Sequence, residues 1–586
     1  MNVADRRPVW LQFTKAVIFL DFSTWLVRRT LLRIVLSAGI AAIAGFQLIH
    51  FISWSPRQLV SYGLIPDDAF FYSVIARNYH QYGYLTFDGD MLTNGVQPLW
   101  MVIQILLVTL FPQENEVVLM SRASWVLYLL FSFLTIWFVT RRKRILEQGV
   151  AALTVGGLLL LNVRFQAFSV KGLETPLLLV LLMVTLIKID GAAEIIRHQP
   201  NSKLSMTATL GLAFWAVLCF FARTDLFWVC IVVGLWLLIA GRQLRWNAVI
   251  YFTAAAVMVT PYLVYNLMTQ AHIIPLSGRI KLFYLHLFYP NWQDYIHSNE
   301  WQGVLAAFIN SFTFLGQLPF LATGALVILT ILIAQLMVWQ KRTRQLFPVS
   351  LQILTVIAAT HIIFMQFVYR ELRPYSDYYF AAEVVWITLV LAYCVSRPIG
   401  HNATRETITS GKKLFSGKGR GSFRMIVVLA SICVAVTSWF HFQPEPSPLW
   451  IQRLNLADDM KQLLPANQHQ VGAIWPGALA QFSGKMIIPL DGLVGSNEFF
   501  QTYVKTGRQF DYLLEQPEAY LAVYLPVAPE YLSAKTLAHL HPWNLNVEKW
   551  LANGDISFKV LASRPLNSEG AGWYLLKIDA ASQKAN

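Results

Sequence analysis

The sequence predicts a polytopic α-helical membrane protein with a C-terminal extracytoplasmic α/β domain. Hydrophobic residues make up 56% of the 586 residues and charged residues only 13%, more apolar surface than the core of a soluble protein can bury. Apolar runs of roughly 20 residues, enough to cross about 30 Å of hydrocarbon, recur up to position 441 and then stop. We therefore expect a cytoplasmic N-terminal tail over 1–30, a transmembrane domain over 31–441 and a water-soluble domain over 442–586.

The basic residues indicate membrane topology, and no nucleic-acid partner is expected. The formal net charge is +14, but Lys and Arg lie mainly in short loops between apolar segments, as in loops that stay in the cytoplasm. Arg6, Arg7 and Lys15 precede the first span without a small-residue cleavage site, so we expect a retained anchor with a cytoplasmic N-terminus. An odd number of spans, about 11 to 13, then places the C-terminal domain outside the plasma (inner) membrane.

One apolar segment does not fit the simplest topology, which has eleven spans. These spans lie near 31–52, 119–140, 150–163, 174–190, 206–222, 226–240, 246–266, 318–339, 347–368, 379–396 and 424–441. The remaining segment, 97–111, is short for a span. It is either a tilted or re-entrant helix, or a full span paired with a second, unrecognised one.

The region after position 441 has the composition of a soluble domain. Segments rich in β-branched and aromatic residues predict strands at Val471–Trp475, Met486–Leu490, Tyr520–Leu525 and Trp573–Ile578. Helical stretches between them indicate a small α/β domain. The four cysteines all lie in apolar runs upstream, so neither a disulfide framework nor a zinc site is expected.

Two adjacent carboxylates, Asp67 and Asp68, follow the first span and are the leading functional candidates. Acids at the edge of a membrane are costly unless they meet a cation, a proton or a substrate. The structural alternative is that Pro66 begins a helix which Asp67 caps, but one cap explains only one of the two acids. The apolar spacing over Ala69–Tyr79 predicts that this helix lies on the membrane surface.

Other polar side chains recur at the predicted outward ends of the spans. Each one alone is more typical of a surface charge that reaches water, but together they predict an outward cavity lined by acids and cations. Carboxylates suit deprotonation of a hydroxyl or binding of a hard cation, whereas Arg and Lys suit a phosphate. The donor-phosphate candidates are Arg279, Lys281, Arg370 and Arg373. The other substrate-site candidates are Asn94, Gln97, Glu174, Arg223, Asp225, Tyr378 and Asp491. For Asp491 the favoured interpretation is that it only turns a loop.

The first outer loop, 53–100, also carries strings that are similar to a known superfamily. Asp67-Asp68-Ala69-Phe70-Phe71-Tyr72, Thr86-Phe87-Asp88-Gly89 and Thr93-Asn94-Gly95-Val96-Gln97-Pro98-Leu99-Trp100 resemble segments of the GT-C polyprenyl-phosphate-sugar-dependent glycosyltransferases, particularly the bacterial members. Weaker similar segments follow in the expected order at 172–175, 275–281 and 489–494, so the resemblance covers most of the chain.

The resemblance implies inverting transfer of a sugar from a polyprenyl-phosphate donor in the membrane to a cell-envelope glycan, lipid or protein acceptor. An acid of the first outer loop would act as base or bind a divalent cation, Mg²⁺ or Mn²⁺. On this chain that role falls on Asp67 or Asp68, and the sequence does not choose between them. Relatives in the protein mannosyltransferase branch have Asp-Glu at the pair and a later His-Pro-Pro segment. Here the pair is Asp-Asp and the segment is Val96-Gln97-Pro98, which argues against protein O-mannosylation.

Two other classes of protein remain as alternatives. A transporter or flippase of lipid-linked sugars needs charges or broken helices near the bilayer midplane, whereas the charges here lie near outward span ends. A structural assembly subunit would tolerate loss of both aspartates. A soluble-substrate hydrolase is not indicated, because the chain has no serine elbow or clustered metal-ligand histidines.

Overall fold

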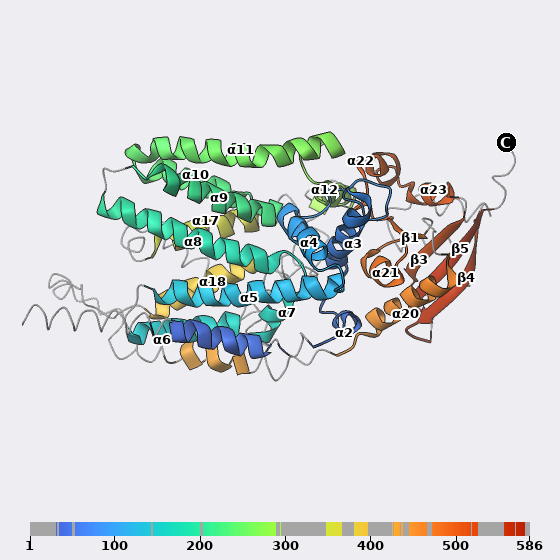
Figure 1. The fold of residues 1–586 in the computed structure, drawn as a ribbon, viewed down its shortest axis with the longest axis horizontal. Helices are drawn as coiled ribbons and strands as arrows, with labels where there is room; N and C mark the ends of the chain where they lie inside the picture. Colours follow the sequence, from blue (N-terminus) through green and yellow to red (C-terminus); the bar gives the residue numbers. More distant parts are fainter. Residues whose placement is uncertain are drawn as a thin grey trace, which may run out of the picture.

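The computed structural model places a helical bundle at one end of the molecule and a sheet with its own helices at the other (Figure 1). It describes residues 34–47, 53–141, 145–199, 203–288, 347–365, 380–396, 445–465, 471–516, 518–525, 556–568 and 570–580, and a few single positions near 31, 49 and 293 and between 425 and 436. The predicted tail over 1–30 and the predicted span at 318–339 lie outside the described residues.

The bundle consists of apolar helices whose bounds follow most of the predicted spans. The long helices are α5 (Glu116–Thr140), α8 (Thr175–His198) and α11 (Arg245–Gln270). The shorter ones are α4 (Pro98–Leu110), α6 (Ile145–Val155), α9 (Met206–Ala222), α10 (Trp228–Ala240), α17 (Val349–Phe364) and α18 (Ala381–Ser396). Short connecting segments are the π-helix η1 (Gly156–Leu160), α7 (Val163–Ser169) and the 3₁₀ turns η2 (Thr224–Leu226) and η3 (Arg242–Leu244). The span predicted at 150–163 is interrupted, because α6 passes into η1 and the chain turns before α7.

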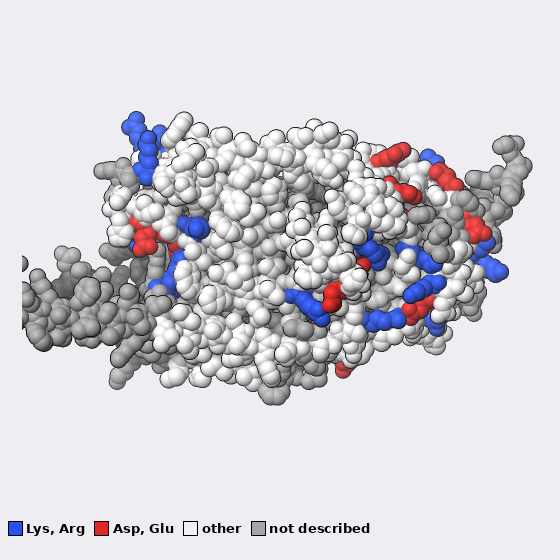
Figure 2. All heavy atoms as spheres, viewed as in Figure 1, with Lys and Arg blue, Asp and Glu red and all other residues white. Residues whose placement is uncertain are grey.

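Several described helices suit a membrane. Glu116–Thr140, Thr175–His198 and Arg242–Gln270 are each long and apolar enough to cross one, and shorter apolar helices accompany them. Helix α4 has 13 residues, which makes it about 20 Å long and shorter than the hydrocarbon core. Figure 2 shows charged side chains toward the two ends of the molecule and a broad uncharged band between them. This distribution is expected of a protein embedded in a bilayer.

Helix α3 (Asp67–Tyr82) is buried in protein, so the prediction that it lies on the membrane surface is wrong. Phe70, Val74 and Ile75 are at most 1% exposed, and the helix packs on α4, α5 and α21 (Gly477–Ser483). The N-cap is Pro66, without a side-chain hydrogen bond, and not Asp67. Periodicity identifies the apolar face of a helix but not whether lipid or protein covers it.

In the described part of the C-terminal domain, five strands form a mixed sheet in the order β2-β1-β3-β5-β4. Its strands are β1 (Val471–Ala473), β2 (Ile487–Pro489), β3 (Ala519–Leu525), β4 (Ile556–Pro565) and β5 (Gly572–Ala580). Its helices are α20 (Pro448–Leu463), α21, α22 (Asn497–Phe499), the π-helix η8 (Phe500–Val504) and α23 (Gln509–Leu514). The four predicted strands are confirmed. Strand β4 was not predicted; among the described residues it lies at the edge of the sheet and pairs with β5 alone.

The carboxyl ends of two parallel strands meet the first outer loop. Strands β1 and β2 pair in parallel, so the loops that follow them leave the same edge of the sheet. A Cβ on Gly95 would lie 2.0 Å from the Leu493 carbonyl oxygen, and one on Gly477 would lie 2.3 Å from the Asp67 carbonyl oxygen. Only glycine permits these backbone contacts. Helices α2 (Pro56–Ser61), α3 and α12 (Leu276–Phe288) border the same junction in Figure 1.

Candidate active site at the domain junction

Asp67 joins helix α3 to the C-terminal domain. Its Oδ2 accepts a hydrogen bond from the Gly477 backbone N–H at 3.1 Å. Its Oδ1 accepts hydrogen bonds from the Ala478 backbone N–H at 2.8 Å and from the Arg453 guanidinium at 2.6 Å. The two N–H groups belong to the first turn of α21, where no intrahelical acceptor is available. We call Asp67, Arg453, Gly477 and Ala478 the Asp67 clamp.

The side chain of Arg453 is buried among residues of the C-terminal domain. Its side chain is 4% exposed, and its guanidinium carbon lies 5.1 Å from the centre of the Trp450 ring and 4.9 Å from that of Trp573. The guanidinium also donates to the Trp475 carbonyl. A buried guanidinium needs a counter-charge, and Asp67 provides it. Asp67 therefore has a structural partner, Arg453, that the sequence did not reveal.

Asp68 lies on a different face of α3 from Asp67. Consecutive helical residues point about 100° apart, so the contacts of Asp67 with α21 direct Asp68 elsewhere. Tyr72 follows Asp68 by four positions and shares its face of the helix. Asp68 is half-buried, whereas Tyr72 is buried.

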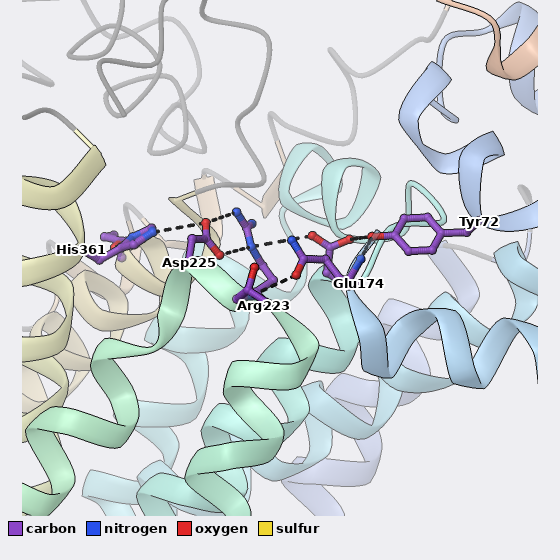
Figure 3. A network of polar contacts seen from close by, with 8 residues as sticks. Tyr72, Glu174, Arg223, Asp225 and His361 are labelled. Carbon is purple, nitrogen blue, oxygen red and sulfur yellow. Dashed lines mark hydrogen bonds and ion pairs between the residues drawn. The ribbon is translucent and has the colours of Figure 1, made fainter. Parts of the chain in front are cut away.

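A chain of buried polar side chains begins at Tyr72, whose hydroxyl donates to Glu174 Oε2 at 3.1 Å. Arg223 lies between two carboxylates. Its Nε is 3.7 Å from Glu174 Oε1, and its Nε and Nη2 donate to the Asp225 carboxylate at 3.1 and 2.6 Å (Figure 3). The structure thus brings together three of the residues predicted from the sequence.

His361 and Glu383 extend this chain into the bundle. His361 Nε2 lies 3.6 Å from Asp225 Oδ2, and its Nδ1 is hydrogen-bonded to Glu383 Oε1 at 2.7 Å. Sequence reasoning missed both residues; a lone ionisable side chain in each apolar run was the available signal. We call Tyr72, Glu174, Arg223, Asp225, His361 and Glu383 the Arg223 network. Its charged members lie at or near helix ends.

Two amide side chains of the first outer loop have different positions. The Gln97 backbone N–H donates to the Tyr72 hydroxyl at 3.1 Å, and Gln97 Oε1 accepts a hydrogen bond from the first residue of η2 at 3.0 Å. Gln97 therefore touches the Arg223 network. Asn94 instead donates to Asn266 Oδ1 at 2.9 Å and accepts from the Leu276 N–H at 2.9 Å, which ties the loop to α11 and α12.

The cationic candidates are only partly described. Arg279, on α12, donates to the Gln270 carbonyl at 3.1 Å and to Asn497 Oδ1 at 2.9 Å, and its guanidinium carbon lies 5.1 Å from the centre of the Phe500 ring. It therefore reaches the C-terminal domain. Lys281 lies two positions along the same helix. The candidates outside the described residues are Arg370, Arg373 and Tyr378.

Asp491 follows β2 and is both a turn residue and a buried acid. Its Oδ1 accepts a hydrogen bond from the Leu493 N–H at 3.0 Å, as the turn interpretation predicts. Its Oδ2 is buried and has no hydrogen-bond partner among the described residues. Burial raises the pKa of Asp491 to about 7, and the negative charges of Asp67 and Asp68 add to this shift; the backbone N–H groups of Leu493 and Trp475 oppose it. Asp491 is therefore close enough to the acid pair to be affected by its charge.

The acids of this junction were also compared with the ligand sets of metal sites. Among the described residues, no group of three or more His, Cys, Asp or Glu side chains could hold a metal ion. Both oxygens of Asp67 already accept hydrogen bonds. Mg²⁺ is usually bound by one or two carboxylates, with water and phosphate oxygens completing the octahedron, so the divalent cation stays a prediction and we derive no step through one.

The chain resembles solved membrane transferases in fold. The apo crystal structure of the Archaeoglobus fulgidus oligosaccharyltransferase matches with a TM-score of 0.51 and 13% identity, over 94% of this chain and 74% of that one. ArnT from Cupriavidus metallidurans bound to undecaprenyl phosphate matches with a TM-score of 0.47 and 12% identity, over 89% of this chain and 96% of that one. Archaeoglobus fulgidus AglB, in complex with an inhibitory peptide and a dolichol-phosphate, matches with a TM-score of 0.48 and 12% identity, over 94% of this chain and 75% of that one.

No protein-family model and no curated protein sequence matches this chain. The structural likeness nevertheless shows that the chain shares its fold with the Archaeoglobus fulgidus oligosaccharyltransferase, in agreement with the fold that the resemblance of its first outer loop implied.

Proposed function

We propose that this protein is an inverting glycosyltransferase that moves a sugar from a polyprenyl phosphate to an extracytoplasmic glycan, lipid or protein. The observation that carries the proposal is the fold shared with an oligosaccharyltransferase over 94% of the chain. The apolar helices would give the lipid part of the donor access to the site from the membrane. The C-terminal domain, which borders the first outer loop, would meet the acceptor from water.

We assign the role of base to Asp68. Asp68 lies on the face of α3 that carries Tyr72 and therefore the Arg223 network, whereas the Asp67 carboxylate faces the C-terminal domain and binds Arg453, Gly477 and Ala478 there. In the proposed step, Asp68 takes the proton of the acceptor hydroxyl as that oxygen bonds to the anomeric carbon. The bond from this carbon to the lipid phosphate breaks, and its electron pair leaves with the phosphate. Because phosphate is a good leaving group, no separate acid is needed.

The remaining candidates have supporting roles in this proposal. Arg279 and Lys281, with Arg370 and Arg373, would stabilise the charge of the departing lipid phosphate. The Arg223 network would hold Tyr72 and therefore the face of α3 that carries Asp68. Residues 31–441 would form the catalytic membrane domain, with its first outer loop at 53–100, and residues 442–586 would close the site on the outer side of the plasma membrane.

The test is single-turnover transfer by the full-length protein in lipid nanodiscs. Radiolabelled polyprenyl-phosphate sugars would be offered with cell-envelope extract as acceptor, to wild type, Asp67→Asn, Asp68→Asn and Asp90→Asn. Loss of a general base typically lowers the rate by about 10² to 10⁴, which we expect for Asp68→Asn. The exposed acid Asp90 is the matched control from the same loop, and its variant should transfer as wild type does.

Each result has a distinct meaning. Full activity of Asp68→Asn with loss of activity in folded Asp67→Asn would reverse the assignment of the base. Full activity of both variants would exclude a catalytic role for the pair. If wild type transfers no sugar from any donor but moves a fluorescent lipid-linked sugar between the leaflets of a vesicle, the transporter alternative replaces the proposal.

A further inference from the structure

His361 and Glu383 form a buried polar pair to which the proposed reaction gives no role of its own. His361 lies in the last turn of α17 and Glu383 in the first turn of α18, and both side chains are 0% exposed. Apolar side chains of similar volume often replace a buried ion pair without loss of stability. Packing of the two helices therefore does not explain why ionisable residues are present here, and such residues in a membrane domain mark functional sites.

Both ring nitrogens of His361 face carboxylates. Its Nδ1 lies 2.7 Å from Glu383 Oε1, and its Nε2 lies 3.6 Å from Asp225 Oδ2. A neutral imidazole carries only one N–H, so one of its nitrogens would turn a lone pair toward a carboxylate. The imidazolium instead offers a donor to each carboxylate. The contacts therefore favour the doubly protonated ring.

The surrounding charges favour the same state. Helix α17 packs on α8, α10 and α18. Of the described charged groups on and beside these helices, Asp225 and Glu383 face the ring, and Glu174 and Arg223 lie beyond Asp225. With its acids ionised, the Arg223 network has three carboxylates, and an imidazolium gives them two positive charges instead of one. Buried charges that are balanced in this way cost less than unpaired ones.

Asp225 belongs to a closed ring of polar contacts, and His361 holds it from outside that ring (Figure 3). Arg223 joins Asp225 to Glu174, and Glu174 accepts a hydrogen bond from the Tyr72 hydroxyl. This hydroxyl accepts a hydrogen bond from the Gln97 N–H. The Gln97 side chain closes the ring, because its Oε1 accepts from the backbone N–H of the residue before Asp225. A shift of Asp225 therefore reaches Tyr72 by two routes.

We infer that His361 is an imidazolium and a positioning residue, whose charge holds the Asp225 carboxylate and thereby fixes Tyr72 and the face of α3 that carries Asp68. Without this charge, Asp225 is bound by Arg223 from one side only and can turn toward it. Arg223 would then move away from Glu174, whose contact with Nε is already the longer one at 3.7 Å. The effect on catalysis rests on the proposed function, whereas the protonation of His361 and the position of Tyr72 do not.

The protonation state is measured by solid-state NMR of the full-length protein in nanodiscs, with ¹⁵N-labelled histidine at neutral pH. The signals of His361 are identified by their loss in His361→Gln, and we expect both of its ring nitrogens to carry a proton. His272, identified by His272→Gln, is the control: its Nδ1 accepts the Ile274 N–H and should carry no proton. A ring nitrogen without a proton in His361 would overturn the inference.

The positioning role is measured with a paired apolar replacement. The double variant His361→Leu/Glu383→Leu should fold, because its two side chains pack without charge. Its ¹³C-tyrosine spectrum should nevertheless show a shifted signal for Tyr72, identified by its loss in Tyr72→Phe. Thr355→Val removes another buried hydrogen bond between α17 and α18, donated by Trp386 at 2.9 Å, and as the matched control should leave that signal in place.

A single variant keeps the inference testable if the double variant does not fold. His361→Gln retains a hydrogen-bond donor but not the charge, and it should shift the Tyr72 signal as well. An unchanged Tyr72 signal in the folded variants would overturn the positioning role.

The transfer assay connects this role to catalysis. We expect the double variant and His361→Gln to lower kcat by about 10- to 100-fold at an unchanged KM for the lipid-linked donor, because misplacement near the base slows the reaction. Thr355→Val should transfer as wild type does. Wild-type rates in both His361 variants would overturn the positioning role and leave the proposed function intact. Absence of transfer by wild type from every donor would refute the proposed function, and the two NMR results would still decide the inference.

Discussion

The Asp67 clamp and the Arg223 network each hold a buried arginine, but they hold it in different ways. Arg453 meets one carboxylate, whose charge is shared with two backbone N–H groups, and two aromatic rings that accept its positive charge. Arg223 lies between two carboxylates, one of which also faces His361. The clamp joins two domains, and Asp67 keeps its hydrogen bonds from the Gly477 and Ala478 N–H groups if Arg453 is lost. The network joins helices of the bundle and depends on the balance of its charges.

The largest effect should come from breaking the network at its centre. In Arg223→Met the carboxylates of Glu174 and Asp225 stay buried without their cation, which should cost about 3–5 kcal/mol of folding free energy. Thermal unfolding in detergent measures the loss. Arg223→Lys, which keeps the charge but not the forked geometry, should lie between this variant and wild type. A melting temperature equal to that of wild type in Arg223→Met would mean that the network charges are not balanced as described.

Breaking the clamp should have a smaller effect on stability and act mainly between the domains. In Arg453→Met, Asp67 keeps its hydrogen bonds from Gly477 and Ala478, so we expect a loss of about 1–3 kcal/mol. Limited proteolysis should cleave the chain between the domains faster in this variant than in wild type. Arg564→Met, which removes a more exposed partner of Asp459, is the matched control. Equal cleavage of the two variants would show that the clamp does not hold the domains together.

The smallest effect should be a change in pH dependence beside the clamp. The pKa of Asp491 is raised from 3.8 to about 7 by burial, so the folded state binds more protons than the unfolded state between these values. Stability from this group is therefore present below about pH 4 and is lost as the pH rises toward 7. Asp491→Asn stays neutral and should show a smaller fall in melting temperature between pH 5 and pH 8. A fall as large as that of wild type would contradict the raised pKa.

Hydropathy predicted the helices because a bilayer imposes long apolar segments, and α9 begins and ends where it was expected. Hydropathy failed for helix α3, because it does not show whether lipid or protein covers an apolar face. Phe70 and Ile75 on α3 carry the pattern of a membrane-surface helix, but α4, α5 and α21 cover them. The π-helix at 156–160 was also unpredictable, since an irregular turn leaves no change in composition.

The candidate site was partly predictable from local patterns. Charges at span ends located Glu174, Arg223 and Asp225, and the structure brings them together. The partners of Asp67 could not be found in this way, because Arg453 lies 386 positions away and nothing in a single sequence encodes that contact.

The Asp67 clamp also has a consequence for how the protein is made. Gly477 lies 410 positions after Asp67, so at about 5–20 residues per second a ribosome needs roughly 20–80 s to synthesise the residues between them. In the proposed topology, the first outer loop is already exported through this interval but lacks its partner. With that topology, a nascent chain cannot assemble the junction until its last domain has crossed the membrane. A chain truncated before that domain would have its early helices but no assembled site.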